Sequence, residues 1–171
     1  MAIVPPPSKD KEPELLEARP AMSLWVRGAL VGVALGLTAL FGLAAWLNPY
    51  QNDGSARRME THRQLGLPEC TFKRVTGYPC PSCGMTTSFA LTIRGDLIDG
   101  VQANSVGVLL ALFLLALIPW CVTSAICERT VFVRSMERVV MFFVIGLLSL
   151  MLLRWVLVLG LMHWMGSAPG F

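Results

Sequence analysis

The chain has 171 residues, of which 54% are apolar, with a mean hydropathy of +0.61 and a formal net charge of +3. This composition is too apolar for an ordinary soluble domain, and the length allows one domain. The basic residues are scattered rather than clustered, which excludes the usual electrostatic footprint of a nucleic-acid-binding protein.

Residues 1–24 are predicted to form a disordered cytoplasmic tail, because a proline run at residues 5–7 is followed by charges of both signs. These mixed charges, and an apolar stretch longer than the ~7–15 residues of a signal peptide, favour an uncleaved membrane anchor. The remaining residues, 25–171, are expected to form a single membrane domain.

Three apolar stretches are long enough to cross a bilayer, which takes about 20 residues. They cover residues 28–47, 106–127 and 139–160. Lipid offers the backbone no hydrogen bonds, so each stretch must be helical. The predicted fold class is therefore an all-α membrane protein with three transmembrane helices, and its first expected partner is the lipid bilayer.

The first span carries three glycines on one helical face, Gly28, Gly32 and Gly36. Small residues at this spacing allow two helices to approach closely in lipid. We expect this face to pack against the second or third span, or against a helix of another membrane protein. Trp25 and Trp46 bracket the span at the separation expected for aromatic belts at the two interfaces.

A polar loop at residues 48–84 and a short helix at residues 84–94 are predicted to connect the first two spans. Met85, Phe89 and Ile93 recur every four residues, which predicts a helix with one apolar face. Such a helix lies in the membrane interface or enters the membrane as a shallow re-entrant helix.

Polar and helix-breaking residues mark the second and third spans. Asn104 is expected to cap the start of the second span, and Pro119 to kink it. Arg154 is the one charge in the third span. It is expected either to reach the nearer membrane surface or to pair with an acidic group such as Asp96 or Asp99.

The placement of Lys and Arg predicts the orientation. Residues 128–138 hold three basic residues in eleven, Arg129, Arg134 and Arg138, against six in the 58 residues of 48–105. The denser side is expected to face the cytoplasm. The N-terminus is then cytoplasmic and the cysteine loop lies on the outer side.

The five cysteines fall into two groups. Cys121 and Cys127 lie at the far end of the second span, roughly 25 Å from its start at a rise of ~1.5 Å per residue. We expect both to be small buried hydrophobic residues. The loop group consists of Cys70, Cys80 and Cys83.

Three interpretations of the loop cysteines remain open. The Cys-Pro-Ser-Cys-Gly turn of residues 80–84 is typical of zinc knuckles, so the three thiolates, with His62 or water as fourth ligand, would bind zinc. The same turn before a helix is also typical of thiol–disulfide oxidoreductases. A disulfide from Cys70 to Cys80 or Cys83 would instead cross-link a loop too small to bury its own core.

The residues around these cysteines resemble the bacterial membrane-protein family called domain-of-unknown-function family 2752, over residues 49–112. The matching positions are Cys70, Phe72, Thr76, Gly77, Pro79, Cys80, Pro81, Cys83, Gly84, Met85, Thr86, Gly95, Asp96 and Asn104. Many members have Arg where this chain has Thr87, so an argument that needs this Arg does not transfer. The resemblance implies a multi-pass envelope protein and supplies no activity. The expected location is the bacterial inner membrane.

The sequence contains no Ser–His–acid set and no glycine-rich phosphate loop. We therefore expect a non-enzymatic envelope scaffold or partner-binding subunit whose loop is held by Cys70, Cys80 and Cys83. The alternative is a membrane thiol–disulfide oxidoreductase that uses Cys80 and Cys83.

Overall fold

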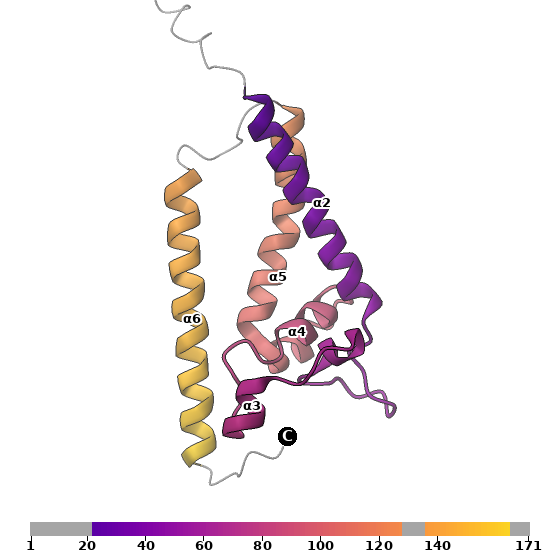
Figure 1. The fold of residues 1–171 in the computed structure, drawn as a ribbon, viewed down its shortest axis with the longest axis vertical. Coiled ribbons are helices and arrows are strands. Elements are labelled where there is room, and N and C mark those ends of the chain that lie inside the picture. The colour runs from indigo at the N-terminus through magenta and orange to yellow at the C-terminus, as the bar shows by residue number, and fades with distance from the viewer. Residues whose placement is uncertain (1–21, 128–135, 165–171) are drawn as a thin grey trace, which may run out of the picture.

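The computed structural model describes residues 22–127 and 136–164, and every named element in these ranges is a helix (Figure 1). The long helices are α2, Leu24–Trp46, α5, Leu97–Ile126, and α6, Met136–Trp164. The short ones are the 3-10 helix η2, Thr61–Leu65, and the α-helices α3, Thr71–Thr76, and α4, Met85–Thr92. The all-α fold class is confirmed.

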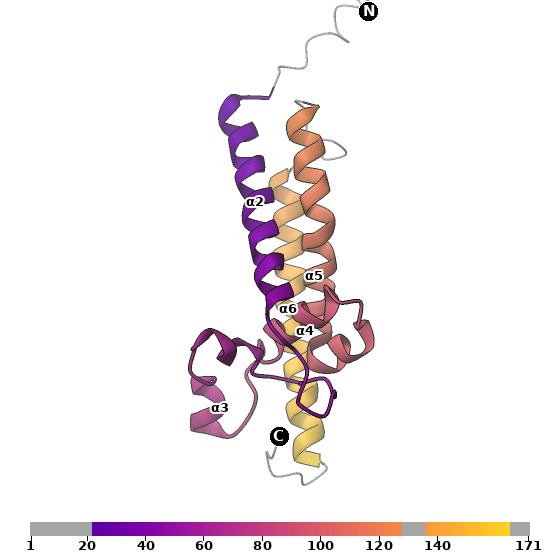
Figure 2. The ribbon, with the colours of Figure 1, turned by 90° about the vertical axis from the view of Figure 1, so that its right-hand side faces the viewer.

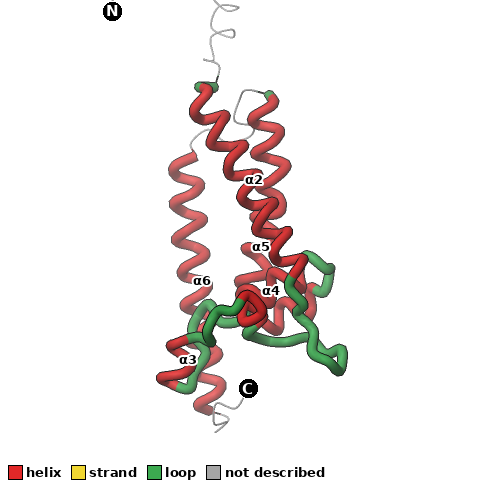
Figure 3. The backbone as a smooth tube through the Cα atoms, turned by 45° about the vertical axis from the view of Figure 1, so that its right-hand side comes forward, coloured by secondary structure: helices red, strands yellow, loops and turns green. Residues whose placement is uncertain are grey.

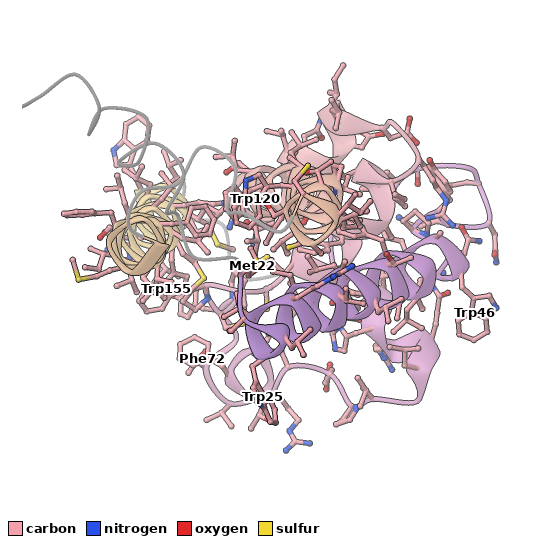
Figure 4. All side chains as sticks on the ribbon, turned by 90° about the horizontal axis from the view of Figure 1, so that it is seen from above. Met22, Trp25, Trp46, Phe72, Trp120 and Trp155 are labelled. Atoms are coloured by element: carbon pink, nitrogen blue, oxygen red, sulfur yellow. The ribbon has the colours of Figure 1, made fainter. Side chains whose placement is uncertain are left out.

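Three helices are long and apolar enough to cross a membrane, as predicted. They are Leu24–Trp46, Leu97–Ile126 and Met141–Trp164. Their exposed apolar side chains indicate contact with lipid, and Trp25 and Trp46 point away from α2 near its two ends (Figure 4). The predicted tail at residues 1–24 lies outside the described residues except for its last three, and Arg129 and Arg134 lie outside them too.

The three long helices stand side by side, and the short elements gather where α2 ends and α5 begins (Figures 2 and 3). α2 packs on α5 through two apolar clusters, one around Leu30 and Cys121 and one around Phe41 and Ala111. α6 contacts α5 through a stack of Phe143 on Phe113, with ring centroids 3.9 Å apart.

Asn104 divides α5 into two helical segments. Its backbone is not helical (φ −159°, ψ 105°), and its Oδ1 accepts the N–H of Gly107 at 3.1 Å. This bond is the one that a helix N-cap makes to the third residue after it. The interruption of α5 therefore lies at Asn104. Pro119 lies inside the second segment, and the kink expected there stays a prediction.

α4 is shorter and more enclosed than the predicted helix of residues 84–94. Six of its eight residues are buried, including Thr87, Ser88 and Thr92. Phe89 stacks on Phe41 of α2 with ring centroids 5.7 Å apart. The predicted apolar face is buried at Phe89, but the polar side chains beside it are buried and hydrogen-bonded as well. This packing is unlike that of a helix lying on the membrane interface.

Arg94 joins the end of α4 to the end of α2. Its guanidinium donates to the carbonyls of Ala45 and Leu47 at 2.7 Å each and to that of Ala44 at 3.3 Å. The last carbonyls of a helix have no partner within the helix, and a cation there also interacts favourably with the helix dipole. Arg94 therefore acts as the C-terminal cap of the first membrane helix.

Gly28, Gly32 and Gly36 do not pack against another described helix. A Cβ atom built at any of the three would meet nothing within 4 Å among the described residues. α2 turns Leu30 and Ala34 toward α5 instead. The expectation that the glycines pack against the second or third span is therefore wrong for the described residues, and contact with another membrane protein remains a prediction.

Candidate metal centre

The fold brings Cys70, Cys80 and Cys83 together. Their Sγ atoms all lie within 4.8 Å of one another, and those of Cys80 and Cys83 are 3.3 Å apart. All three are partly buried free thiols. A tetrahedral zinc ion with Zn–S bonds of ~2.3 Å keeps its sulfur ligands about 3.8 Å apart. The spacing of these three sulfurs therefore suits one shared ion.

A tight turn presents Cys80 and Cys83 on the same side. The N–H of Cys83 donates to the carbonyl of Cys80 at 3.0 Å, and the N–H of Cys80 donates to Cys83 Sγ at 3.3 Å. Cys70 directly precedes α3, the helix on the other side of the cluster. Two chain segments therefore contribute the three thiols.

Gly84 is required where the turn enters α4. Its φ is +83°, a conformation that residues with a Cβ rarely adopt. A Cβ here would lie 2.5 Å from the carbonyl oxygen of Ala103 and 2.9 Å from that of Arg58. The cysteine turn thus touches the backbone of α5 and of the loop at a point where only hydrogen fits.

Asn104 fixes the turn against the break in α5. Its side chain is fully buried, and its Nδ2 donates to the carbonyl of Cys83 at 3.1 Å while its Oδ1 caps the second segment of α5. One side chain therefore sets the start of the second membrane segment and holds the last cysteine.

Trp155 of α6 holds the other end of the turn. Its Nε1 donates to the carbonyl of Pro79 at 2.8 Å. The Trp155 ring also meets Phe72 of α3 edge-on, with centroids 6.0 Å apart, and Figure 4 shows the two rings as neighbours. The third membrane helix thus contacts both segments that supply cysteines.

Arg154 binds a backbone carbonyl instead of an acidic side chain. Its Nη2 donates at 3.1 Å to the carbonyl of Ala103, which is free because the N–H of Gly107 bonds to Asn104. Asp96, one of its expected partners, accepts a hydrogen bond from the hydroxyl of Tyr50. The expectation of pairing with Asp96 or Asp99 is wrong, because the break in α5 supplies a carbonyl acceptor. The expectation that Arg154 reaches the nearer membrane surface stays a prediction.

Cys80 and Cys83 differ in acidity. Partial burial opposes ionisation of Cys80, but hydrogen bonds from Ser82, Cys83 and Cys70 outweigh it and lower the pKa of Cys80. Burial, together with the hydrogen bond to Cys80, raises the pKa of Cys83 to about 12. Cys80 is thus the thiol that ionises first, and a metal ion must displace the proton of Cys83 in order to bind.

The cysteines line a cavity of about 300 Å³, which His62, Glu60 and Lys73 also line. His62 Nε2 lies 3.2 Å from the carbonyl oxygen of Pro68. The cluster of ligand atoms within 4.8 Å of one another consists of the three cysteine sulfurs and does not include a His62 nitrogen. The structure therefore does not gather His62 with the thiols. Lys73 donates to Glu60 at 2.8 Å, and this bond lowers the pKa of Glu60.

Three residues that hold the site were not identified from the sequence: Trp155, Arg94 and Thr61. Thr61 is fully buried in η2 and shares a hydrogen bond of 2.8 Å with Thr87. No spacing rule connects these residues to their partners, which lie far away in the sequence. The sequence offers one weak indication of the role of Trp155, which is that it directly follows Arg154, the sole charge of the third span.

The other two cysteines lie at the opposite end of α5. Cys121 is buried in the cluster with Leu30 and Ala34, as expected. Cys127 is exposed, so its predicted burial is wrong. It is the C-cap residue of α5, where the helix ends and packing against α2 stops.

Comparison with protein families matches residues 70–118 to the family described as "Protein of unknown function (DUF2752)". The match starts at Cys70 and covers the cysteine turn, α4 and most of α5, whereas the resemblance was expected over residues 49–112. No curated protein and no solved structure matches the chain. The resemblance to domain-of-unknown-function family 2752 is thereby confirmed over residues 70–118.

Proposed function

We propose that this chain is a non-enzymatic membrane protein whose loop, residues 48–84, is held by one zinc ion bound to Cys70, Cys80 and Cys83. The observation that carries the proposal is the mutual distance of the three sulfurs, within 4.8 Å. Zinc accepts three thiolates with a fourth ligand, here water or His62 from the same cavity.

A structural role for the ion follows from what surrounds it. Gly84, Asn104 and Trp155 connect the cysteine turn to α5 and α6, so an ion at this place ties the loop to two membrane helices. The loop is too short to bury a core of its own, and metal-binding free energy contributes directly to folding in such segments. An ordered loop on one face of the membrane is the surface that a scaffold or partner-binding subunit needs.

The proposed location is the bacterial inner membrane, with the N-terminus in the cytoplasm and the cysteine loop outside. The density of basic residues at 128–138 supports this orientation. A phosphatase reporter fused after residue 171 is expected to be active, because it works only outside the cytoplasm. Activity of a cytoplasmic reporter at that position would reverse the orientation.

A second candidate function is thiol–disulfide exchange, which the acidity difference between Cys80 and Cys83 favours. Here the Cys80 thiolate would attack a disulfide of another protein, and Cys83 would resolve the mixed disulfide. This candidate requires Cys83→Ser to accumulate a mixed disulfide through Cys80, seen by non-reducing electrophoresis. If no such species forms, the exchange function is rejected.

Labelling with a membrane-permeable maleimide tests the zinc proposal. We expect Cys80 and Cys83 to be protected in native membranes and to react after a chelator is added, while Cys127, which is exposed, reacts throughout. Protection that a reductant alone removes would indicate a disulfide instead. Immediate labelling of both thiols in untreated membranes would contradict any structural role.

A further inference from the structure

A second cavity, of about 230 Å³, lies between α6 and the loop. Its lining has a polar part and an apolar part. The polar part includes Arg58, Gln102 and Arg154. The apolar part is mainly α6 and includes Trp155, Val158 and Leu161. The proposed zinc site does not explain this cavity, although the cysteine turn contributes to its wall.

Among the described residues, the two arginines of the cavity have no acidic partner. Arg58 Nη2 donates to Gln102 Oε1 at 3.3 Å, and Arg154 Nη2 donates to the carbonyl of Ala103 at 3.1 Å. The ion pairs among the described residues join Glu60 to other basic residues, and no acidic side chain lines this cavity. A guanidinium has five N–H donors, so both arginines have donors left for an anion.

The cavity also lies at the boundary between apolar and polar parts of the molecule. Arg154 is level with the break of α5 at Asn104, where the second membrane segment meets the polar loop. On the other side, the surface of α6 is apolar and exposed at Val156, Leu157 and Leu161. A ligand here therefore meets cations at one end and a lipid-facing helix at the other.

We propose that this cavity binds the phosphate head group of an acidic phospholipid. Arg58 and Arg154 donate to the phosphate oxygens, and the acyl chains lie along Val158 and Leu161. Basic pockets between membrane helices bind acidic head groups in this way. The volume is below the ~300–1,000 Å³ of sites that enclose a whole drug-sized ligand, so the cavity holds the head group and leaves the chains in the bilayer.

The test is native mass spectrometry of the full chain released from nanodiscs that contain equal amounts of phosphatidylglycerol and phosphatidylcholine. We expect one phosphatidylglycerol to stay bound to the wild-type protein. Arg58→Gln and Arg154→Gln each remove a charge-assisted hydrogen bond and are expected to reduce this species about tenfold. Arg74→Gln makes the same charge change at an exposed residue outside the cavity and is expected to leave it unchanged.

Arg58→Gln is the deciding variant, because Arg154 also holds α6 to Ala103 and its loss can displace that helix. Unchanged phosphatidylglycerol binding in Arg58→Gln, or equal retention of the two lipids by the wild type, would overturn the proposal. Titration with inorganic phosphate separates the lipid from a free anion. Phosphate that displaces the lipid only at far higher concentration supports the proposal, and phosphate that binds as tightly as the lipid overturns it.

Discussion

Trp155 donates its indole N–H to the carbonyl of Pro79 at 2.8 Å, so the third membrane helix holds the residue directly before the cysteine turn. These two residues are 76 positions apart in the sequence. The contact is important because no residue in the membrane window of α6 is buried. Few contacts with the other described residues therefore position this helix. α6 is therefore placed by a small set of contacts, which join it to this segment through Trp155 and to α5 through Arg154 and Phe143.

Trp155→Phe is expected to lower the free energy of unfolding by about 1 kcal/mol, because it removes the hydrogen bond and keeps most of the ring. Thermal unfolding of the purified protein in detergent measures the change. Trp164→Phe is the control, since Trp164 is 85% exposed at the end of α6. Equal midpoints for the two variants would show that the contact with Pro79 contributes nothing.

Gly84→Ala is expected to destabilise the protein far more than Gly95→Ala. Both glycines have a positive φ, which costs about 1–2 kcal/mol for a residue with a Cβ. Only at Gly84 does the added Cβ also collide with backbone, 2.5 Å from the carbonyl oxygen of Ala103. Unfolding midpoints of the two variants provide the comparison, and similar values would contradict the close approach at the cysteine turn.

Arg94→Lys is expected to cost about 1–3 kcal/mol, although the charge is kept. The planar guanidinium reaches the carbonyls of Ala44, Ala45 and Leu47 together, whereas an ammonium does not reproduce this fork. Arg74→Lys, at an exposed residue, is the control for the substitution itself. Chemical unfolding that gives the same stability for Arg94→Lys and the wild type would rule out this role in capping α2.

In reduced, metal-free protein at about pH 8, we expect iodoacetamide to modify Cys80 before Cys83. The pKa of Cys80 is lowered and that of Cys83 is raised to about 12, so Cys80 holds the larger thiolate fraction at this pH. Raising the pH increases both fractions and narrows the difference between the two rates. Peptide mass spectrometry after short reaction times reports the order, and faster modification of Cys83 would contradict it.

The membrane helices could be predicted because run length alone identifies an apolar span. The cap at Asn104 could also be predicted, since a short polar side chain before an apolar run is a local signal. The burial of α4 could not be predicted from the sequence. Its Thr87 and Ser88 resemble the solvated face of an interfacial helix, and they become buried only because Thr61 and the carbonyl of Met85 satisfy them.

In the candidate metal centre, too, contacts between residues close in the sequence could be predicted, and contacts between distant residues could not. The pairing of Cys80 with Cys83 follows from their spacing, but the position of Cys70 depends on the path of the chain through α3. His62 was a plausible ligand by proximity in sequence, yet its ring nitrogen lies beside the carbonyl of Pro68. The partner of Arg154 is a backbone carbonyl, which no side-chain pattern reveals.

The central claim is that Cys70, Cys80 and Cys83 bind one zinc ion, and zinc analysis with X-ray absorption tests it most directly. The account predicts one zinc per chain with three sulfur neighbours at ~2.3 Å. It also predicts loss of the metal in each of Cys70→Ser, Cys80→Ser and Cys83→Ser, and its retention in Cys121→Ser. A purified, folded protein that contains no zinc and takes up none after reduction would contradict it.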